Sequence, residues 1–222
     1  MVRMAGIDTT SIAITSILYH LMQNQNAYRR LTAEIDEAVK NGTVSIPISY
    51  ADSLKLPYLK ACINEGMRLH PSIALTMPRE VAEGGAAISG IFFPEGYRIG
   101  INPAVIQYDK AVFGSDADIF NPDRWLHGDL VAMDKAMLHF GAGTRTCIGK
   151  NVSLCHNTRR GMVCLTFIQI ALSEIYKLIP QVLRLFTIRL AETDKDLETK
   201  NYWFNKQIGV KIRVEARDIS TR

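Results

Sequence analysis

The chain has 222 residues, of which 47% are hydrophobic and 22% charged, and a formal net charge of +4. This length allows one good core and at most two domains, and the composition is that of an ordinary globular protein. The small charge, without a dense run of Lys or Arg, argues against nucleic acid as a partner. A modestly basic patch could still attract an acidic protein.

The cysteines are Cys62, Cys147, Cys155 and Cys164. They show neither C-x-x-C pairing nor the Cys/His spacing of a zinc site, which fits reduced thiols in a compartment facing the cytosol. No secretory signal is recognisable, and the most apolar stretch, 162–172, is too short to span a bilayer. We therefore expect no membrane anchor in this chain.

Apolar residues at helical spacing predict a helix over 2–25, and further helices follow over 27–40 and 53–69. Asn41-Gly42 ends the second helix and His70-Pro71 the third.

Strands are expected next, at 74–81 and in a hairpin of 86–93 with 97–101 that turns at Pro94-Glu95-Gly96. A short helix and then an irregular meander are expected over 103–138. The meander is long for a loop without regular structure and needs internal bracing.

After Cys147 we expect a helix that runs on to a kink at Pro180, and then strands at 186–190 and 210–214. The segment Tyr202-Trp203-Phe204 between these strands is apolar enough to pack against the core.

One loop dominates the sequence, His139-Phe140-Gly141-Ala142-Gly143-Thr144-Arg145-Thr146-Cys147-Ile148-Gly149-Lys150. Its glycines allow the backbone to approach a flat partner closely. A helix that starts after Gly149 would favour a thiolate at its N-terminus. These features suit a cysteine used as an anionic metal ligand, although a lone cysteine in a glycine-rich turn is more often simply buried.

The full spacing is F-x-x-G-x-R-x-C-x-G, formed by Phe140, Gly143, Arg145, Cys147 and Gly149. It resembles the haem-ligand loop of the cytochrome P-450 family of haem-thiolate monooxygenases. The resemblance implies that the Cys147 thiolate is the axial ligand of haem b (iron protoporphyrin IX) and that Arg145 pairs with a haem propionate. Phe140 would shield the sulfur and help to set the iron potential.

Near the start, Ala5-Gly6-Ile7-Asp8-Thr9-Thr10 is an unusual helix interior, and by propensity Asp8 or Thr9 would be an N-cap. The stretch also resembles the family's oxygen-binding motif. By that resemblance Asp8 relays protons and Thr9 hydrogen-bonds the oxygen, because cleaving the O–O bond requires protons delivered at hydrogen-bond distance.

Glu65 and Arg68 are three residues apart on one helix face, a spacing that by itself indicates only a solvated ion pair. In the resembled family this pair is buried and joined by a later arginine. Here that residue is Arg124, in Pro122-Asp123-Arg124-Trp125, and the implied role is structural. Arg124 and Trp125 would also brace the meander.

Other roles follow from the resemblance alone. Arg79 would pair with a second haem propionate, or else is an exposed residue at a strand end. The stretch 73–75 would line the substrate side of the haem. Lys135 and Lys150 would meet the acidic face of a reductase that brings electrons from NADPH, and the substrate would be a small organic molecule.

The resemblance implies a mainly α fold with small β-sheets (α+β), the C-terminal half of the cytochrome P-450 fold, so that 1–222 forms a partial domain. We expect exposed apolar surface at Ile12, Ile14 and Ile17, where the missing half would pack. The full-length parent would lie at the endoplasmic reticulum membrane, on its cytosolic face. Residues 155–172 interrupt the helix after Cys147, and we suspect a non-native insertion.

A second class of function stays open. The chain could be a non-catalytic remnant or interaction module that holds no haem. A zinc or iron–sulfur site is disfavoured by the cysteine spacing.

Overall fold

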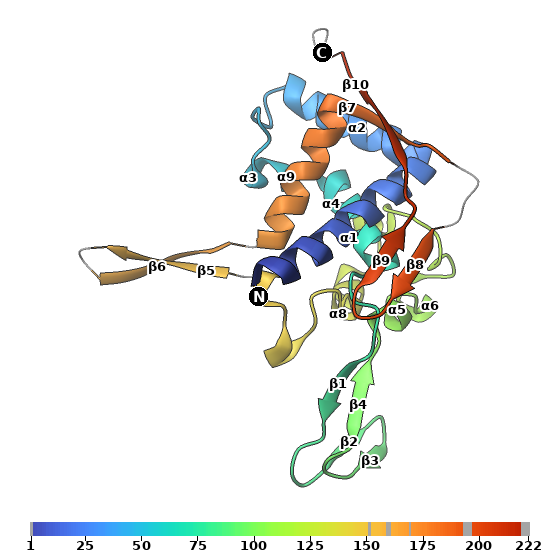
Figure 1. Ribbon diagram of the computed structural model, residues 1–222, viewed down its shortest axis with the longest axis vertical. Helices are drawn as coiled ribbons and strands as arrows, with labels where there is room; N and C mark the ends of the chain where they lie inside the picture. Colours follow the sequence, from blue (N-terminus) through green and yellow to red (C-terminus); the bar gives the residue numbers. More distant parts are fainter. Residues whose placement is uncertain (1, 151, 159–160, 169, 193–196, 219–222) are drawn as a thin grey trace.

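The helices α1, α2, α4 and α9 form the body of the molecule in a computed structural model that describes residues 2–150, 152–158, 161–168, 170–192 and 197–218 (Figure 1). Their bounds are Val2–Gln23, Gln25–Lys40, Pro57–Leu69 and Ile170–Leu185. Each of α2, α4 and α9 turns one apolar face inward, as the sequence periodicity predicts. The core lies between these faces and α1.

The closest approach in this core joins α1 and α4 at a glycine. A Cβ atom on Gly66 would lie 2.6 Å from Ile17 Cγ1, too close for any side chain. Ser16 Oγ donates a hydrogen bond of 2.8 Å to the Gly66 carbonyl at the same crossing. The hydrogen bond from Ser16 to the Gly66 carbonyl and the lack of a side chain on Gly66 together fix how α1 and α4 cross.

The prediction of exposed apolar surface on α1 is wrong for two of its three residues. Ile12 is 4% exposed and Ile17 is fully buried, while Ile14 is partly buried against the core. The reason is that α1 packs on both α4 and α9, so most of its circumference is already covered.

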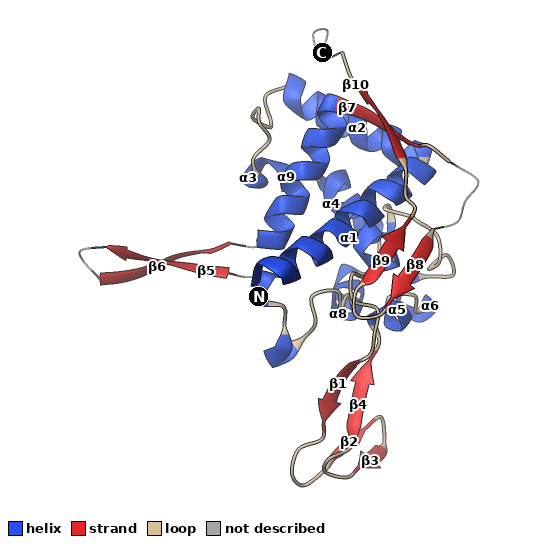
Figure 2. Cartoon of the chain, viewed as in Figure 1, coloured by secondary structure: helices blue, strands red, loops and turns tan. Residues whose placement is uncertain are grey.

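Short antiparallel strands form an arm below the helices in Figure 2. Strand β1 (Met77–Glu80) pairs with β4 (Arg98–Ile101), and β2 (Ala86–Ile88) pairs with β3 (Ile91–Phe93). The predicted hairpin of 86–93 with 97–101 is therefore wrong. The chain turns earlier, at Ser89-Gly90, where both residues have positive φ angles of 51° and 80°, the geometry of a tight two-residue hairpin turn.

Four short helices lie in 103–138, namely the one predicted at its start and three in place of the irregular meander expected after it. They are α5 (Pro103–Ile106), α6 (Lys110–Phe113), α7 (Arg124–His127) and α8 (Leu130–Ala136), preceded earlier in the chain by α3 (Tyr50–Ser53). Side chains of Asn102, Asp109 and Asp129 accept hydrogen bonds from the first turns of α5, α6 and α8.

The helix expected directly after Cys147 is divided. A 3₁₀ turn, η2 (Ile148–Lys150), is followed by the hairpin of β5 (Val152–Thr158) and β6 (Gly161–Ile168), and only then by α9. This hairpin extends away from the helical body in Figure 1.

After α9, β7 (Phe186–Leu190) pairs with β10 (Ile212–Ala216), and β8 (Glu198–Asn201) pairs with β9 (Asn205–Ile208). The expectation that Tyr202-Trp203-Phe204 packs inward is wrong for two residues. Tyr202 is 84% and Trp203 66% exposed, because they form the tip of the β8–β9 hairpin.

Helices with several small antiparallel sheets confirm the predicted α+β class. Over the part of the chain that the structure describes, each helix is too short or too polar to cross a membrane.

Candidate functional site

The loop around Cys147 is closed on itself by backbone hydrogen bonds. The Cys147 N–H donates to the Phe140 carbonyl at 2.7 Å, so residues seven apart lie side by side. At one end, Gly141 N–H donates to the Leu138 carbonyl at 2.8 Å. The Cys147 side chain itself is exposed. The loop therefore presents its thiol outward from a defined backbone ring.

Two glycines of the loop are needed for their conformation. Gly141 and Gly143, which begins the 3₁₀ turn η1 (Gly143–Arg145), have φ angles of 70° and 64°, which side chains rarely adopt. A Cβ on Gly143 would meet no atom within 4 Å. Gly143 thus faces open space on the loop surface, which leaves its backbone accessible to a flat group.

The inner side of the loop is apolar and carries few charges. Phe140 is partly buried against the core, its ring 4.5 Å from that of His139 and 5.9 Å from Lys150 Nζ. The Nδ1 atom of His139 is buried without a hydrogen-bond partner, and burial, helped by Lys150, lowers the pKa of His139 to about 3. His139 is therefore neutral at physiological pH.

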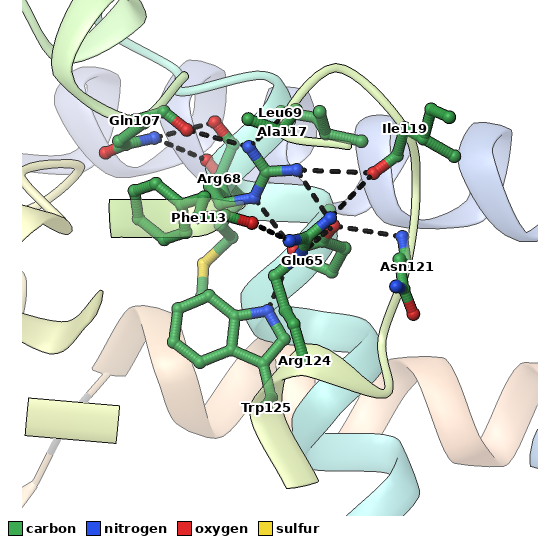
Figure 3. A network of polar contacts seen from close by, with 12 residues as sticks. Glu65, Arg68, Leu69, Gln107, Phe113, Ala117, Ile119, Asn121, Arg124 and Trp125 are labelled. Carbon is green, nitrogen blue, oxygen red and sulfur yellow. Dashed lines mark hydrogen bonds and ion pairs between the residues drawn. The ribbon is translucent and has the colours of Figure 1, made fainter. Parts of the chain in front are cut away.

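Figure 3 shows a network of hydrogen bonds and ion pairs around Glu65, Arg68 and Arg124. Glu65 is fully buried on α4, and its two oxygens accept hydrogen bonds from Arg68 at 2.8 Å each. Oε1 also accepts from Arg124 Nε and from the Asn121 N–H, both at 3.0 Å, and Oε2 accepts from Trp125 Nε1 at 2.8 Å. These hydrogen bonds offset the cost of burying a carboxylate away from water.

The two arginines donate their remaining hydrogen bonds to groups in the segment 103–138. Arg68 Nη1 donates to the carbonyls of Gln107 at 2.7 Å and Ala117 at 2.6 Å. Arg124 donates to the Phe113 carbonyl and forms an ion pair of 3.0 Å with Asp116. The segment after β4 is thereby tied to α4, with two carboxylates balancing two guanidinium groups.

Gln107 carries the connection from this network to the cysteine loop. It is fully buried, and its Nε2 donates to the Arg68 carbonyl at 2.7 Å while its Oε1 accepts from the Leu138 N–H at 3.0 Å. The Leu138 carbonyl in turn accepts from Gly141 in the loop. Sequence reasoning missed Gln107, and a single glutamine after a short apolar stretch gives no signal for this role.

The residues singled out at the start of the chain lie on a different element, the first turns of α1. Asp8 is exposed, and its carbonyl accepts a bond of 2.9 Å from Ser11 Oγ. The carbonyl of the partly buried Thr9 accepts a bond of 2.8 Å from Ser72 Oγ. This contact ties α1 to the segment that leads into β1.

Both candidate arginines for an acidic ligand are exposed. Arg145 lies on η1, and Arg79 lies on β1 with Nη1 donating to the adjacent Pro78 carbonyl at 2.9 Å. Within the described residues neither guanidinium forms an ion pair with a carboxylate. On the route from α4 to β1, Ala74 is buried, and Ile73 and Leu75 are partly buried.

The donor set of the loop suits haem better than a bare metal ion. Among the described residues, no cluster of three or more His, Cys, Asp or Glu side chains is placed to hold an ion. A single exposed thiol would suit an iron whose remaining ligands come from a macrocycle. The open space at Gly143 and the outward Cys147 side chain fit a flat group lying on the loop.

Comparison with known proteins points the same way. The profile of the family described as Cytochrome P450 matches residues 2–158. The chain is 41% identical to the Cytochrome P450 monooxygenase gsfF of Penicillium aethiopicum, over 97% of this chain and 39% of that protein. It is 43% identical to the Cytochrome P450 monooxygenase ACRTS1 of Alternaria alternata, over 96% of this chain and 52% of that protein. It is 39% identical to Pisatin demethylase of Fusarium vanettenii, over 91% of this chain and 35% of that protein. The chain thus spans roughly a third to a half of the length of these three relatives.

Proposed function

The chain belongs to the cytochrome P450 family, and we propose that it carries the haem-thiolate centre of a monooxygenase. The observation that carries the proposal is the exposed Cys147 thiol in a closed glycine loop, held from behind by the buried Glu65 network. When bound, haem b supplies the chemistry by which one atom of O2 enters an organic substrate while the other leaves as water.

Cys147 would hold the iron through its thiolate. The Phe140 ring packs under the loop, and its apolar surface would keep water from the sulfur. Arg145 and Arg79 would bind the haem propionates, because a guanidinium fork matches a carboxylate and neither has an ion-pair partner within the described residues. The backbone at Gly143 would lie against the macrocycle.

Asp8 and Thr9 would deliver the protons that the reaction consumes. The exposed Asp8 carboxylate is able to exchange protons with solvent, and the Thr9 hydroxyl would pass them on at hydrogen-bond distance. The Ser72 bond to the Thr9 carbonyl would hold this part of α1 in place. The partly buried Ile73 and Leu75 would contact a small organic substrate.

Electrons would come from NADPH through a reductase. Lys135 is exposed on α8, and Lys150 lies beside the Phe140 ring next to the loop. Both would attract an acidic protein surface. The full-length parent would work at the cytosolic face of the endoplasmic reticulum.

Titration of the purified chain with haem tests the proposal. We expect saturable uptake at one haem per chain and a loss of affinity of at least tenfold in Cys147→Ala. Cys62→Ala is the matched control, because Cys62 is a fully buried thiol on α4. Equal affinity in wild type and Cys147→Ala would overturn the assignment.

The second candidate function is that of an interaction module without haem. The exposed thiol loop and the exposed hairpin tip at Tyr202 and Trp203 offer surface for another protein. A folded chain that takes up no haem at any concentration would favour this candidate.

A further inference from the structure

The elements η2 and α9 lie against each other although residues 151–169 separate them in sequence. Cα atoms of the two elements approach within 8 Å. A single residue placed between Lys150 and Ile170 spans up to about 7 Å, because consecutive Cα atoms are about 3.8 Å apart. A linker of one residue is therefore compatible with the close approach of η2 and α9.

The described part of the segment between them is a hairpin whose strands pair with each other. Strands β5 and β6 pair along their length with each other, and the hairpin extends away from the helical body in Figure 1. Isolated two-stranded hairpins are marginally stable in water. Closing a loop of this length also costs conformational entropy.

Helical register also points to a direct join. If Asn151 were followed by Ile170, Lys150 would stand four residues before Leu172, on the same face of one helix. Leu172 packs against the core, and Ile175, Tyr176 and Ile179 continue that face. The partly buried Lys150 thus falls in phase with the buried side of α9.

We infer that residues 152–169 are translated intron sequence, and that the mature chain joins Asn151 to Ile170 in one helix. Every valine codon begins with GT, and Val152-Ser153 has codons that spell the usual intron start, GTAAGT or GTGAGT. Gln169 ends in AG if its codon is CAG. Leu165-Thr166 has codons that spell the branch-point sequence CTAAC or CTGAC. The eighteen codons keep the reading frame.

These bounds are shifted by three residues from the 155–172 expected from sequence, because α9 begins at Ile170 and Leu172 already packs on the core. The inference is independent of haem, because it concerns how η2 and α9 are connected. Beyond the proposed function, the mature protein would have a continuous helix that follows Cys147 and includes α9.

Sequencing the gene and its mature transcript tests the inference. We expect a CAG codon for Gln169, and transcript reads in which codon 151 is followed directly by codon 170. Mature messages that all retain the eighteen codons would overturn it, as would a CAA codon at 169.

The protein without residues 152–169 supplies an independent test. We expect its melting temperature to exceed that of the 222-residue chain by on the order of 5 °C. The reason is that the conformational entropy lost on closing the loop of residues 152–169 no longer opposes folding. Far-ultraviolet circular dichroism should show a higher helical fraction. A lower melting temperature with reduced helix would contradict the join, whether or not either protein binds haem.

Discussion

Trp125 Nε1 donates a hydrogen bond of 2.8 Å to Glu65 Oε2, and both side chains are buried. The bond joins α7 to α4 across 60 residues of sequence, beside the ion pairs of Glu65 with Arg68 and Arg124. The indole thus contributes a neutral donor to a carboxylate that is otherwise held by charged groups and one backbone N–H.

Trp125→Phe should lower the free energy of unfolding by about 2 kcal/mol. The ring volume is mostly kept, while a buried charged oxygen loses one of its donors. Chemical denaturation followed by circular dichroism measures the change. Trp203→Phe is the matched control, since Trp203 is 66% exposed, and it should change stability by less than about 0.5 kcal/mol. Equal effects at both positions would show that the hydrogen bond to Glu65 is of no consequence.

Gln107→Met should cost about 3 kcal/mol of unfolding free energy. The substitution keeps the length of the side chain but leaves the Arg68 carbonyl and the Leu138 N–H without their buried partner. The exposed Gln25 donates to the Met22 carbonyl, so Gln25→Met removes a comparable bond where water replaces it. Denaturation curves of the two variants should differ clearly, and coincident curves would contradict the bridging role of Gln107.

Gly66→Ala should destabilise the chain by about 1–3 kcal/mol, because the new methyl group would overlap Ile17 at the crossing of α1 and α4. Gly6→Ala in α1 is the matched control, since its Cβ would meet nothing within 4 Å. This second variant should be neutral or stabilising by up to about 1 kcal/mol, because Ala is the better helix former. Thermal melts should therefore show a lower melting temperature for Gly66→Ala and an unchanged or higher one for Gly6→Ala.

His20 should make the fold sensitive to acid. Burial is the main cause that lowers the pKa of His20 from 6.5 to about 4, and its Nε2 is buried without a partner. Because the pKa of His20 is lowered in the folded state, the contribution of the neutral ring to folding stability is complete above pH 6.5. This contribution is lost as the pH falls toward about 4. We expect the free energy of unfolding to fall by an amount on the order of 2 kcal/mol. The effect is limited to this size because the residue as a whole is only partly buried.

The comparison variant is His20→Phe, which keeps the stacking on Phe120 and removes the titration. Unfolding free energies of wild type and variant, measured from pH 7 to pH 4.5, should diverge as the pH falls, with the variant favoured in acid. The difference isolates His20 from the buried His70 and His139, whose pKa values are also lowered by burial. Parallel curves would contradict this role for His20.

The helices could be predicted from sequence because their signals are local. The apolar spacing on α2 and α4 and the ending at Asn41 follow from neighbouring residues. Strand pairing could not, since β4 joins β1 across more than fifteen residues instead of its predicted neighbour. The exposure of Trp203 likewise depends on the β8–β9 turn and not on its hydrophobicity.

The site was predictable only through a known family pattern of residue types and spacing. The spacing around Cys147, and the resemblance that it supports, pointed to Glu65, Arg68 and Arg124, which the structure brings into one network. Gln107 was not predictable, because its bonds go to backbone groups of Arg68 and Leu138 that no side-chain pattern reveals.

The most direct test of the central claim is the absorption spectrum of the haem-reconstituted chain after reduction and addition of carbon monoxide. We expect the Soret band at the position typical of thiolate-ligated haem, unchanged in Cys62→Ala and absent in Cys147→Ala. The same spectra should be recorded on the chain without residues 152–169, so that the connection of η2 to α9 does not decide the outcome. A thiolate-type band that persists in Cys147→Ala, or haem uptake by both wild-type forms without such a band, would contradict Cys147 as the iron ligand.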